Sequence, residues 1–212
     1  MTEPGPGAGA QEPANGETVS GRSYRGEDWY GAELVDVRFS VCTFVEVDFT
    51  EATTRGVVFQ ECMFRNCKFN ASTHDSTAFI AGDFQRCSFF GATLEGCKLD
   101  GSVFAGCTLR PITVRGGSWR SVTLRGADLG GLDLRKLDLR DADLSLSDLS
   151  GADLRECRLD GASVRETDLS EADLRGASVT GVDLREATLR ATQVDLQAAV
   201  QLAEQCGTLV EI

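Results

Sequence analysis

The chain carries a large apolar residue at almost every fifth position from Tyr24 to Val194. Of the 35 positions in this series, only Thr54 and His74 are neither large nor apolar. A period of five matches neither the 3.6-residue turn of an α-helix nor the two-residue alternation of a flat strand. The chain must therefore turn through the same angle after each repeat, which predicts a repeat architecture with one continuous core.

A second regular position lies two residues before each apolar centre and is usually Ala, Cys or Ser. Because side chains two residues apart in an extended chain point to the same side, the small and large residues share one interior. The other three positions are mostly polar or Gly, and we expect them outside, with Gly at the corners. At these corners, Pro111 is expected to fit a turn with a modest effect on hydrogen bonding. His74 is expected at a solvated or locally distorted corner, with a functional histidine as the alternative.

Two repeats show the pattern clearly: Ala-Asp-Leu-Gly-Gly at 127–131 and Ala-Asp-Leu-Arg-Glu at 152–156. They resemble the A(D/N)LXX signature of pentapeptide repeat proteins, and the resemblance covers residues 22–196 without a break in phase. It implies an all-β fold, a right-handed quadrilateral β-helix with four pentapeptides in each coil. At the ~4.8 Å spacing of hydrogen-bonded strands, the rod would be roughly 40 Å long.

Two segments flank the predicted β-helix of residues 22–194. Residues 1–21 are rich in Gly, Pro, Ala and Glu, and we expect a disordered N-terminal tail. Residues 195–212 are expected to form a short α-helix and tail, with Asp195 as the N-cap and Gly207 just after the C-terminus. Since the last coil of a solenoid exposes open strand edges and an apolar core, this helix would cover that end as a cap or as a dimer contact.

Eight cysteines suggest metal or redox chemistry, but their positions favour a structural role. Seven of them occupy the small inward position, where Cys acts as a compact hydrophobe: Cys42, Cys62, Cys67, Cys87, Cys97, Cys107 and Cys157. There is no CxxC motif, and one histidine cannot complete a zinc site of mixed ligands. We therefore expect no metal and no other cofactor.

Catalytic motifs are also lacking in the sequence. There is no GxSxG, P-loop or dinucleotide-binding fingerprint. The many carboxylates repeat on an exposed surface, without the burial that would shift their pKa values for acid–base work. The sequence therefore predicts that the chain is not an enzyme.

The formal charge of −12, from 33 acidic and 21 basic residues, opposes nucleic-acid binding and suits a basic partner surface. No apolar run approaches the ~20 residues that would span a membrane, so no membrane association is expected. The first residues lack the apolar stretch of a secretory signal. We therefore expect a cytoplasmic protein with reduced thiols.

If four pentapeptides make a coil, residues twenty apart stack on one face. We number the faces by their first blocks: 22–26 (face 1), 27–31 (face 2), 32–36 (face 3) and 37–41 (face 4). The formal charges over residues 22–196 are +1, −5, −3 and 0 on faces 1 to 4. This acidity is either a solvated rod surface or a rigid ladder of negative charge resembling a phosphate backbone. The candidate partner-binding residues on face 2 are Glu27, Asp28, Asp48, Glu51, Asp128, Asp148, Asp168 and Glu171.

Three stretches resemble the MfpA/Qnr-like family of gyrase-interacting pentapeptide repeat proteins: 101–111, 128–134 and, outside the repeat, Val-Asp-Leu-Gln-Ala-Ala-Val at 194–200. The resemblance implies a DNA mimic that binds DNA gyrase, a type II topoisomerase, and modulates it or protects it from fluoroquinolones or other poisons. It also implies a homodimer joined through the C-terminal helix. The alternative is a rigid acidic scaffold or adaptor rod without a topoisomerase partner. The candidate dimer residues are Leu196, Ala199, Val200, Leu202 and Ala203.

Overall fold

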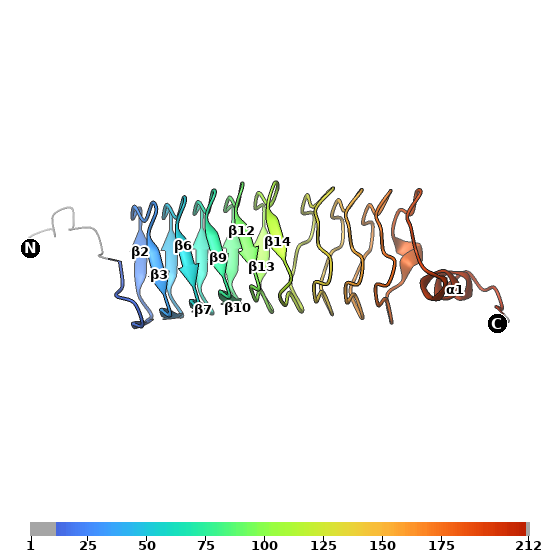
Figure 1. The fold of residues 1–212 in the computed structure, drawn as a ribbon, viewed down its shortest axis with the longest axis horizontal. Coiled ribbons are helices and arrows are strands. Elements are labelled where there is room, and N and C mark those ends of the chain that lie inside the picture. Colours follow the sequence, from blue (N-terminus) through green and yellow to red (C-terminus); the bar gives the residue numbers. More distant parts are fainter. Residues whose placement is uncertain (1–11, 211–212) are drawn as a thin grey trace, which may run out of the picture.

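The chain forms a right-handed quadrilateral β-helix closed at one end by a short α-helix (Figure 1). The structure, a computed structural model, describes residues 12–210. Each strand pairs in parallel with the strand twenty residues away, as Val19 with Phe39 and Tyr24 with Phe44. The predicted fold class, with four pentapeptides per coil, is confirmed.

Among residues 12–210, fourteen strands of three residues each occupy three of the faces. They are β1 Thr18–Ser20, β2 Ser23–Arg25, β3 Glu33–Val35, β4 Arg38–Ser40, β5 Thr43–Val45, β6 Thr53–Arg55, β7 Val58–Gln60, β8 Met63–Arg65, β9 Thr73–Asp75, β10 Ala78–Ile80, β11 Asp83–Gln85, β12 Thr93–Glu95, β13 Val103–Ala105 and β14 Thr113–Arg115. The sheets are β13-β11-β8-β5-β2 on face 1, β14-β12-β9-β6-β3 on face 3 and β1-β4-β7-β10 on face 4. Face 2, and the coils after β14, continue the same parallel register through isolated bridges.

The core changes composition along the rod. In residues 17–121, which we call the Phe half, rings stack from coil to coil; the Phe44–Phe64 and Phe64–Phe84 centroids are 4.8 and 4.6 Å apart. Rings on adjacent faces meet edge to face, an arrangement that the aromatic quadrupole favours. In residues 122–194, the Leu half, leucines fill the same positions. Both halves bury their centres, so the two fillings support one backbone.

The corner of each repeat lies two residues after the centre and has a left-handed backbone. Its φ is positive at every repeat from Gly16 to Ala191 except at Pro111 and Glu186. Glu186 belongs to a 3-10 helix, η1 Leu184–Glu186, in the last coil. Proline cannot adopt a positive φ, because its ring fixes φ near −65°.

At Pro111 the backbone hydrogen-bond ladder opens on two faces. On face 1, Thr123 N–H still donates to Ser102 O at 2.8 Å, and on face 4 Trp119 N–H still donates to the next coil. Within residues 12–210, no backbone hydrogen bond joins 107–111 to 127–131 on face 2, or 112–116 to 132–136 on face 3. We call this opening the seam. The predicted modest effect of Pro111 was wrong, since proline denies the corner both its left-handed φ and its N–H.

His74 is buried in the aromatic core, which corrects the prediction of a solvated or distorted corner. Its Nδ1 lies 2.7 Å from Thr54 Oγ1 and its Nε2 lies 2.9 Å from Ser72 Oγ. Thr54 Oγ1 also lies 2.6 Å from Thr77 Oγ1. The two non-apolar centres of the sequence therefore stack on each other and satisfy each other's polar atoms. Burial lowers the pKa of His74 to about 4, so the ring is neutral at pH 7.

The solenoid begins earlier than predicted. Strand β1 lies inside the segment expected to be a disordered tail, and Val19 is buried in the core. Gly16 N–H donates to Val35 O at 2.9 Å, so the first corner is already paired with the next coil. The signal was present in the sequence, because Val19, Gly16 and Gly21 are in phase with the later repeats. The expected tail at 1–11 lies outside the described residues, as do 211–212.

Candidate functional site: the acidic face

Face 2 places the predicted carboxylates in line. Parallel bridges pair Asp28 with Asp48, Asp128 with Asp148, and Asp148 with Asp168, so these side chains repeat once per coil. The carboxylates form two groups: an N-terminal acidic cluster of Glu27, Asp28, Asp48 and Glu51, and a C-terminal acidic cluster of Asp128, Asp148, Asp168 and Glu171. The bridges stop between Thr108 and Asp128, so the seam separates the two clusters.

The N-terminal acidic cluster is partly neutralised and partly turned inward. Lys68 Nζ lies 3.1 Å from Asp48 Oδ2 and follows it in the same line. Glu27 occupies the inward position two residues before Trp29 and is half-buried, whereas Asp28 and Glu51 are exposed. Glu27 is therefore less accessible to a partner than Asp28 and Glu51, and the assignment of the four residues to a partner-binding face stays a prediction.

In the C-terminal acidic cluster, local hydrogen bonds hold the aspartates in place. The Oδ1 of Asp148 accepts the N–H of Ser150 at 2.8 Å, and that of Asp168 accepts the N–H of Ser170 at 2.9 Å. Such a turn fixes the orientation of the carboxylate. The hydrogen bonds from Ser170 hold the pKa of Asp168 below its ordinary value.

The aspartates of this cluster differ in how their charge is compensated. Arg110 Nη1 reaches across the seam to within 3.2 Å of Asp128 Oδ1, so Asp128 is paired. Asp148 and Asp168 form no ion pair within 4 Å in the described chain. The two aspartates farthest from the seam are therefore outside ion-pair distance of a basic side chain, although Arg190 on the same face contributes to the lowered pKa of Asp168.

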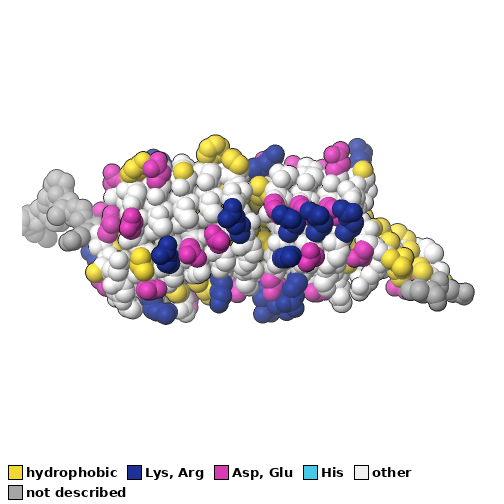
Figure 2. Space-filling view, in the orientation of Figure 1, with side chains coloured by type: hydrophobic (Ala, Val, Ile, Leu, Met, Phe, Trp, Pro, Cys, Tyr) yellow, Lys and Arg dark blue, Asp and Glu magenta, His cyan; other side chains and the backbone are white. Residues whose placement is uncertain are grey.

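Face 3 has a comparable number of aspartates in its C-terminal part, but arginines neutralise them. Arg135 and Arg155 each chelate the aspartate two residues earlier, with Nη2–Oδ2 distances of 2.6 Å to Asp133 and Asp153. The Arg175 guanidinium does the same for Asp173 and lowers the pKa of that carboxyl to about 2. Rows of both signs are visible in Figure 2 on the C-terminal half of the rod. Formal charge counts did not distinguish paired from unpaired aspartates, because the pairing depends on whether an Arg follows the Asp two residues later.

The C-terminal helix, α1 Leu196–Gln205, closes the last coil. As predicted, Asp195 is its N-cap: Oδ1 accepts Ala198 N–H at 3.0 Å, and Oδ2 accepts Gly176 N–H from the preceding coil at 2.9 Å. Gln201 and Gln205 donate to Val182 O at 3.0 and 2.6 Å. These amides pair with open backbone groups of the final coil, which sequence periodicity had not indicated because both residues are polar.

One candidate dimer residue faces the solenoid instead of solvent. Leu202 is half-buried and packs against the core beside the fully buried Ala198, so it contributes to capping the solenoid, and its place in a dimer contact stays a prediction. Leu196 and Ala199 are exposed, the former at 73%, and Val200 and Ala203 are half-buried. These four residues follow helical spacing and form an apolar stripe on the side away from Ala198.

No helix among residues 12–210 is long and apolar enough to cross a membrane. The same part of the chain brings together no group of three or more His, Cys, Asp or Glu side chains that could hold a metal ion. The seven inward cysteines lie beside the core, and their thiols bond to backbone oxygens of the preceding coil, as Cys67 does to Phe44 O at 3.4 Å.

Comparison with known proteins agrees with this architecture. A model described as "Pentapeptide repeat region" matches residues 57–134, and one described as "Pentapeptide repeats (8 copies)" matches 31–70, 120–155 and 152–190. A search of curated proteins finds no match. A trypsin-treated form of QnrB1, a plasmid-mediated fluoroquinolone resistance protein, is 18% identical with a TM-score of 0.71, over 93% of this chain and 99% of that one.

Two further solved structures match with lower scores. Full-length QnrB1 has a TM-score of 0.45 at 18% identity, over 91% of both chains. HetL, a pentapeptide repeat protein involved in the regulation of heterocyst differentiation in the cyanobacterium Nostoc sp. strain PCC 7120, has a TM-score of 0.31 at 23% identity, over 84% of this chain and 89% of that one. At these identities the likeness concerns the fold alone. The unbroken five-residue phase, the four-sided coil and the matching family models together show that this chain belongs to the pentapeptide repeat family.

Proposed function

We propose that this protein is a DNA mimic that binds DNA gyrase through its acidic face and modulates the enzyme. The observation that carries the proposal is the C-terminal acidic cluster, whose aspartates repeat once per coil, with Asp148 and Asp168 fixed by their own turns and in no ion pair within 4 Å in the described chain. Duplex DNA likewise presents negative charges at a fixed spacing along a rigid rod. A DNA-handling surface is basic, so it would attract this face.

The likeness to QnrB1 supports the choice of partner, since QnrB1 is a fluoroquinolone resistance protein of the same fold. We further propose that the chain protects gyrase from fluoroquinolones or other gyrase poisons. Two acidic partners of a basic site compete with one another, so bound protein would displace DNA and reduce supercoiling. Electrostatic steering predicts fast association that weakens as salt is added.

We also propose a homodimer joined by the apolar stripe of α1. Its residues, Leu196, Ala199, Val200 and Ala203, lie on the opposite side of the helix from those that cap the solenoid. Two rods joined end to end would double the length of acidic surface. Light scattering should give twice the mass of one chain, and Val200→Glu should give the monomer, whereas the exposed polar change Gln197→Glu should leave the mass unchanged.

A supercoiling titration with purified gyrase, with and without a fluoroquinolone, tests the proposed partner. We expect the wild-type protein to inhibit supercoiling, and we expect at least a tenfold weaker effect when the C-terminal acidic cluster is neutralised by Asp128→Asn, Asp148→Asn, Asp168→Asn and Glu171→Gln. Asparagine keeps the oxygen that accepts the turn hydrogen bond, so the fold should persist.

A matched variant removes four exposed carboxylates from the other faces: Glu33→Gln, Glu95→Gln, Asp141→Asn and Glu166→Gln. It carries the same net charge as the face 2 variant and should retain most of the inhibition. An equal loss of inhibition in both variants would show that the effect depends on net charge and not on the acidic face. Absence of any gyrase interaction at low salt would favour the adaptor rod.

A further inference from the structure

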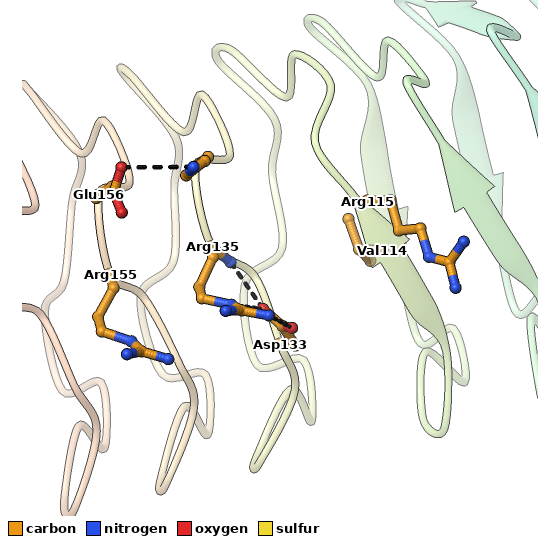
Figure 3. Close-up of a pocket in the computed structure, with 7 residues that line it drawn as sticks. Val114, Arg115, Asp133, Arg135, Arg155 and Glu156 are labelled. Carbon is orange, nitrogen blue, oxygen red and sulfur yellow. Dashed lines mark hydrogen bonds and ion pairs between the residues drawn. The ribbon is translucent and has the colours of Figure 1, made fainter.

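The seam on face 3 is a hollow in the side of the rod with a volume of about 340 Å³, within the range of ligand pockets. Figure 3 shows β14, with Val114 and Arg115, on one side of it and Asp133 and Arg135 on the other. The charged residues that line it are Arg115, Asp133, Arg135, Lys136, Arg155 and Glu156. No residue of the acidic face takes part, so this is a separate surface.

Both sides of the seam are open strand edges. Strand β14 is the last strand of its five-stranded sheet, and its other edge is paired through Thr113 N–H to Ala92 O at 2.9 Å. One coil further, the ladder is closed again: Asp153 N–H donates to Leu132 O at 2.9 Å. By the same register, the N–H groups of Val114, Gly116 and Asp133 would donate across the seam, and none does within residues 12–210. Unpaired backbone edges are templates for another strand.

The charge around these edges is locally reversed. Four basic side chains face two carboxylates, in a chain whose net charge is −12. Three of the basic side chains are already paired: Arg135 with Asp133 at 2.6 Å, Lys136 with Glu156 at 3.7 Å and Arg155 with Asp153 at 2.6 Å. Arg115 forms no ion pair in the described part of the chain. Arg115 therefore gives the seam a positive charge without a partner in the described chain, which attracts an anionic group.

From these two observations we propose that the seam binds an extended acidic peptide segment of a partner protein, which adds a strand to the open edge of β14. Alternate donors and acceptors along the edge match a peptide backbone, and the basic side chains match carboxylates. The added strand would pair with the edge of β14. To pair with the edge of residues 132–136 as well, it would need the two edges ~9.6 Å apart, which is twice the normal strand spacing. The closed ladders on faces 1 and 4 confine the added strand to the open side.

The repeat register predicts the sequence of the added strand. Its central residue would lie between Val114 and Leu134 and point into the core, so it should be apolar. The next residue would lie outward between Arg115 and Arg135, so it should be Glu or Asp. The residue before the centre would lie beside Thr113 and should be small and β-branched. The preferred core of the peptide is therefore Thr-Leu-Glu, and a second Glu would face Lys136.

Fluorescence anisotropy with the full chain and a labelled peptide, Ser-Thr-Leu-Glu-Glu-Ser, tests this proposal. We expect saturable binding, about fivefold weaker for Arg115→Ser or Arg135→Ser, as expected for losing one exposed ion pair. Arg175→Ser is the matched control, because Arg175 makes the same aspartate chelate beside a closed ladder. It should bind as the wild type does.

Two peptide variants separate strand addition from general attraction. N-methylation of the Thr before the central Leu removes the N–H that would donate to Ile112 O at the β14 edge and should abolish binding, while exchange of both Glu for Lys should do the same through charge. Hydrogen exchange should show new protection of the Val114 and Gly116 amides when the unmodified peptide is bound. Equal binding of the N-methylated peptide, equal loss in Arg175→Ser, or no binding of the parent peptide would each overturn the proposal.

Discussion

The Phe half and the Leu half build the same coil from different interactions. In the Phe half, the position before each centre is often Thr or Val, residues that favour strands, and aromatic rings stack between coils. In the Leu half that position is usually Asp, whose side chain accepts the N–H of the residue just before the corner and favours a turn over a strand. The first half is therefore held chiefly by its core, and the second also by its surface.

The boundary between the halves shows which differences in sequence interrupt the backbone hydrogen bonds between coils. Face 1 passes from Phe104 to Leu124 with its ladder intact, since Phe104 N–H donates to Thr123 O at 3.0 Å. The ladder fails on the faces that adjoin Pro111. A solenoid of this kind therefore tolerates a change of core residue more easily than one corner that cannot become left-handed.

The largest difference should appear when one core side chain is removed from each half. Phe64→Ala takes away a ring stacked on both sides and should destabilise the Phe half by about 3–5 kcal/mol, more than Leu154→Ala does in the Leu half. Amide hydrogen exchange should accelerate in the mutated half and change little across the seam. Equal acceleration in both halves would show that the seam does not divide their stability.

The next largest difference between the halves should appear in how their stability depends on pH. The folded pKa of His74 is about 4, below its ordinary 6.5, so its stabilisation is complete above pH 6.5 and falls as pH decreases toward 4. Between pH 7 and 4.5 this costs about 2–3 kcal/mol. The folded pKa of Asp173 is about 2, so its stabilisation is present above pH 3.8 and falls only as pH decreases through 2.

Chemical denaturation at pH 7 and pH 4.5, followed by exchange in each half, measures this separation. The Phe half should weaken first. His74→Leu, which restores the residue found one coil later at Leu94, should remove most of the difference between the two pH values. An unchanged pH dependence in that variant would assign it to other groups.

Closing the seam should have a smaller effect. Pro111→Gly permits the left-handed corner and supplies an N–H, so the amides of Val114 and Asp133 should become protected. The restored hydrogen bonds, less the greater freedom of unfolded glycine, predict a gain of about 1–2 kcal/mol. The added-strand site should disappear with it, and peptide binding by a variant whose amides are protected would contradict the assignment of that site.

The smallest expected effect concerns the turn aspartates of the Leu half. Asp148→Ala removes the acceptor for Ser150 N–H and should cost about 0.5–1 kcal/mol, whereas Asp148→Asn should be nearly neutral. Ser88→Ala, at the same face position in the Phe half, removes a hydroxyl that donates to Asn70 Oδ1 at 2.6 Å but no acceptor of a turn N–H, so it should cost less than Asp148→Ala. Thermal denaturation of the three variants provides the comparison.

The sequence was sufficient for the fold because every repeat agrees with the next. The apolar centres, small inward residues and corner glycines give one phase, and Asp195 and Gly207 delimit the terminal helix. The functional site was harder to predict from the sequence than the fold. The pairing of Asp133 with Arg135 and the burial of the His74 network depend on side-chain geometry that a five-residue period does not encode. The effect of Pro111 could have been predicted from the sequence, because this proline occupies the corner position, where the neighbouring repeats have a positive φ that proline cannot adopt.

The twenty-residue coil restricts how the gene for this protein can vary in length. An insertion of twenty codons at the seam would leave every downstream side chain on its own face. An insertion of five would preserve the core pattern and yet rotate all that follows by a quarter turn, moving Asp148 and Asp168 to a neighbouring face. Insertions whose length is not a multiple of five would exchange inward and outward positions in all the repeats that follow. Insertions of five and of twenty residues would thus both preserve the core, and only the insertion of twenty would keep both acidic clusters on the same face.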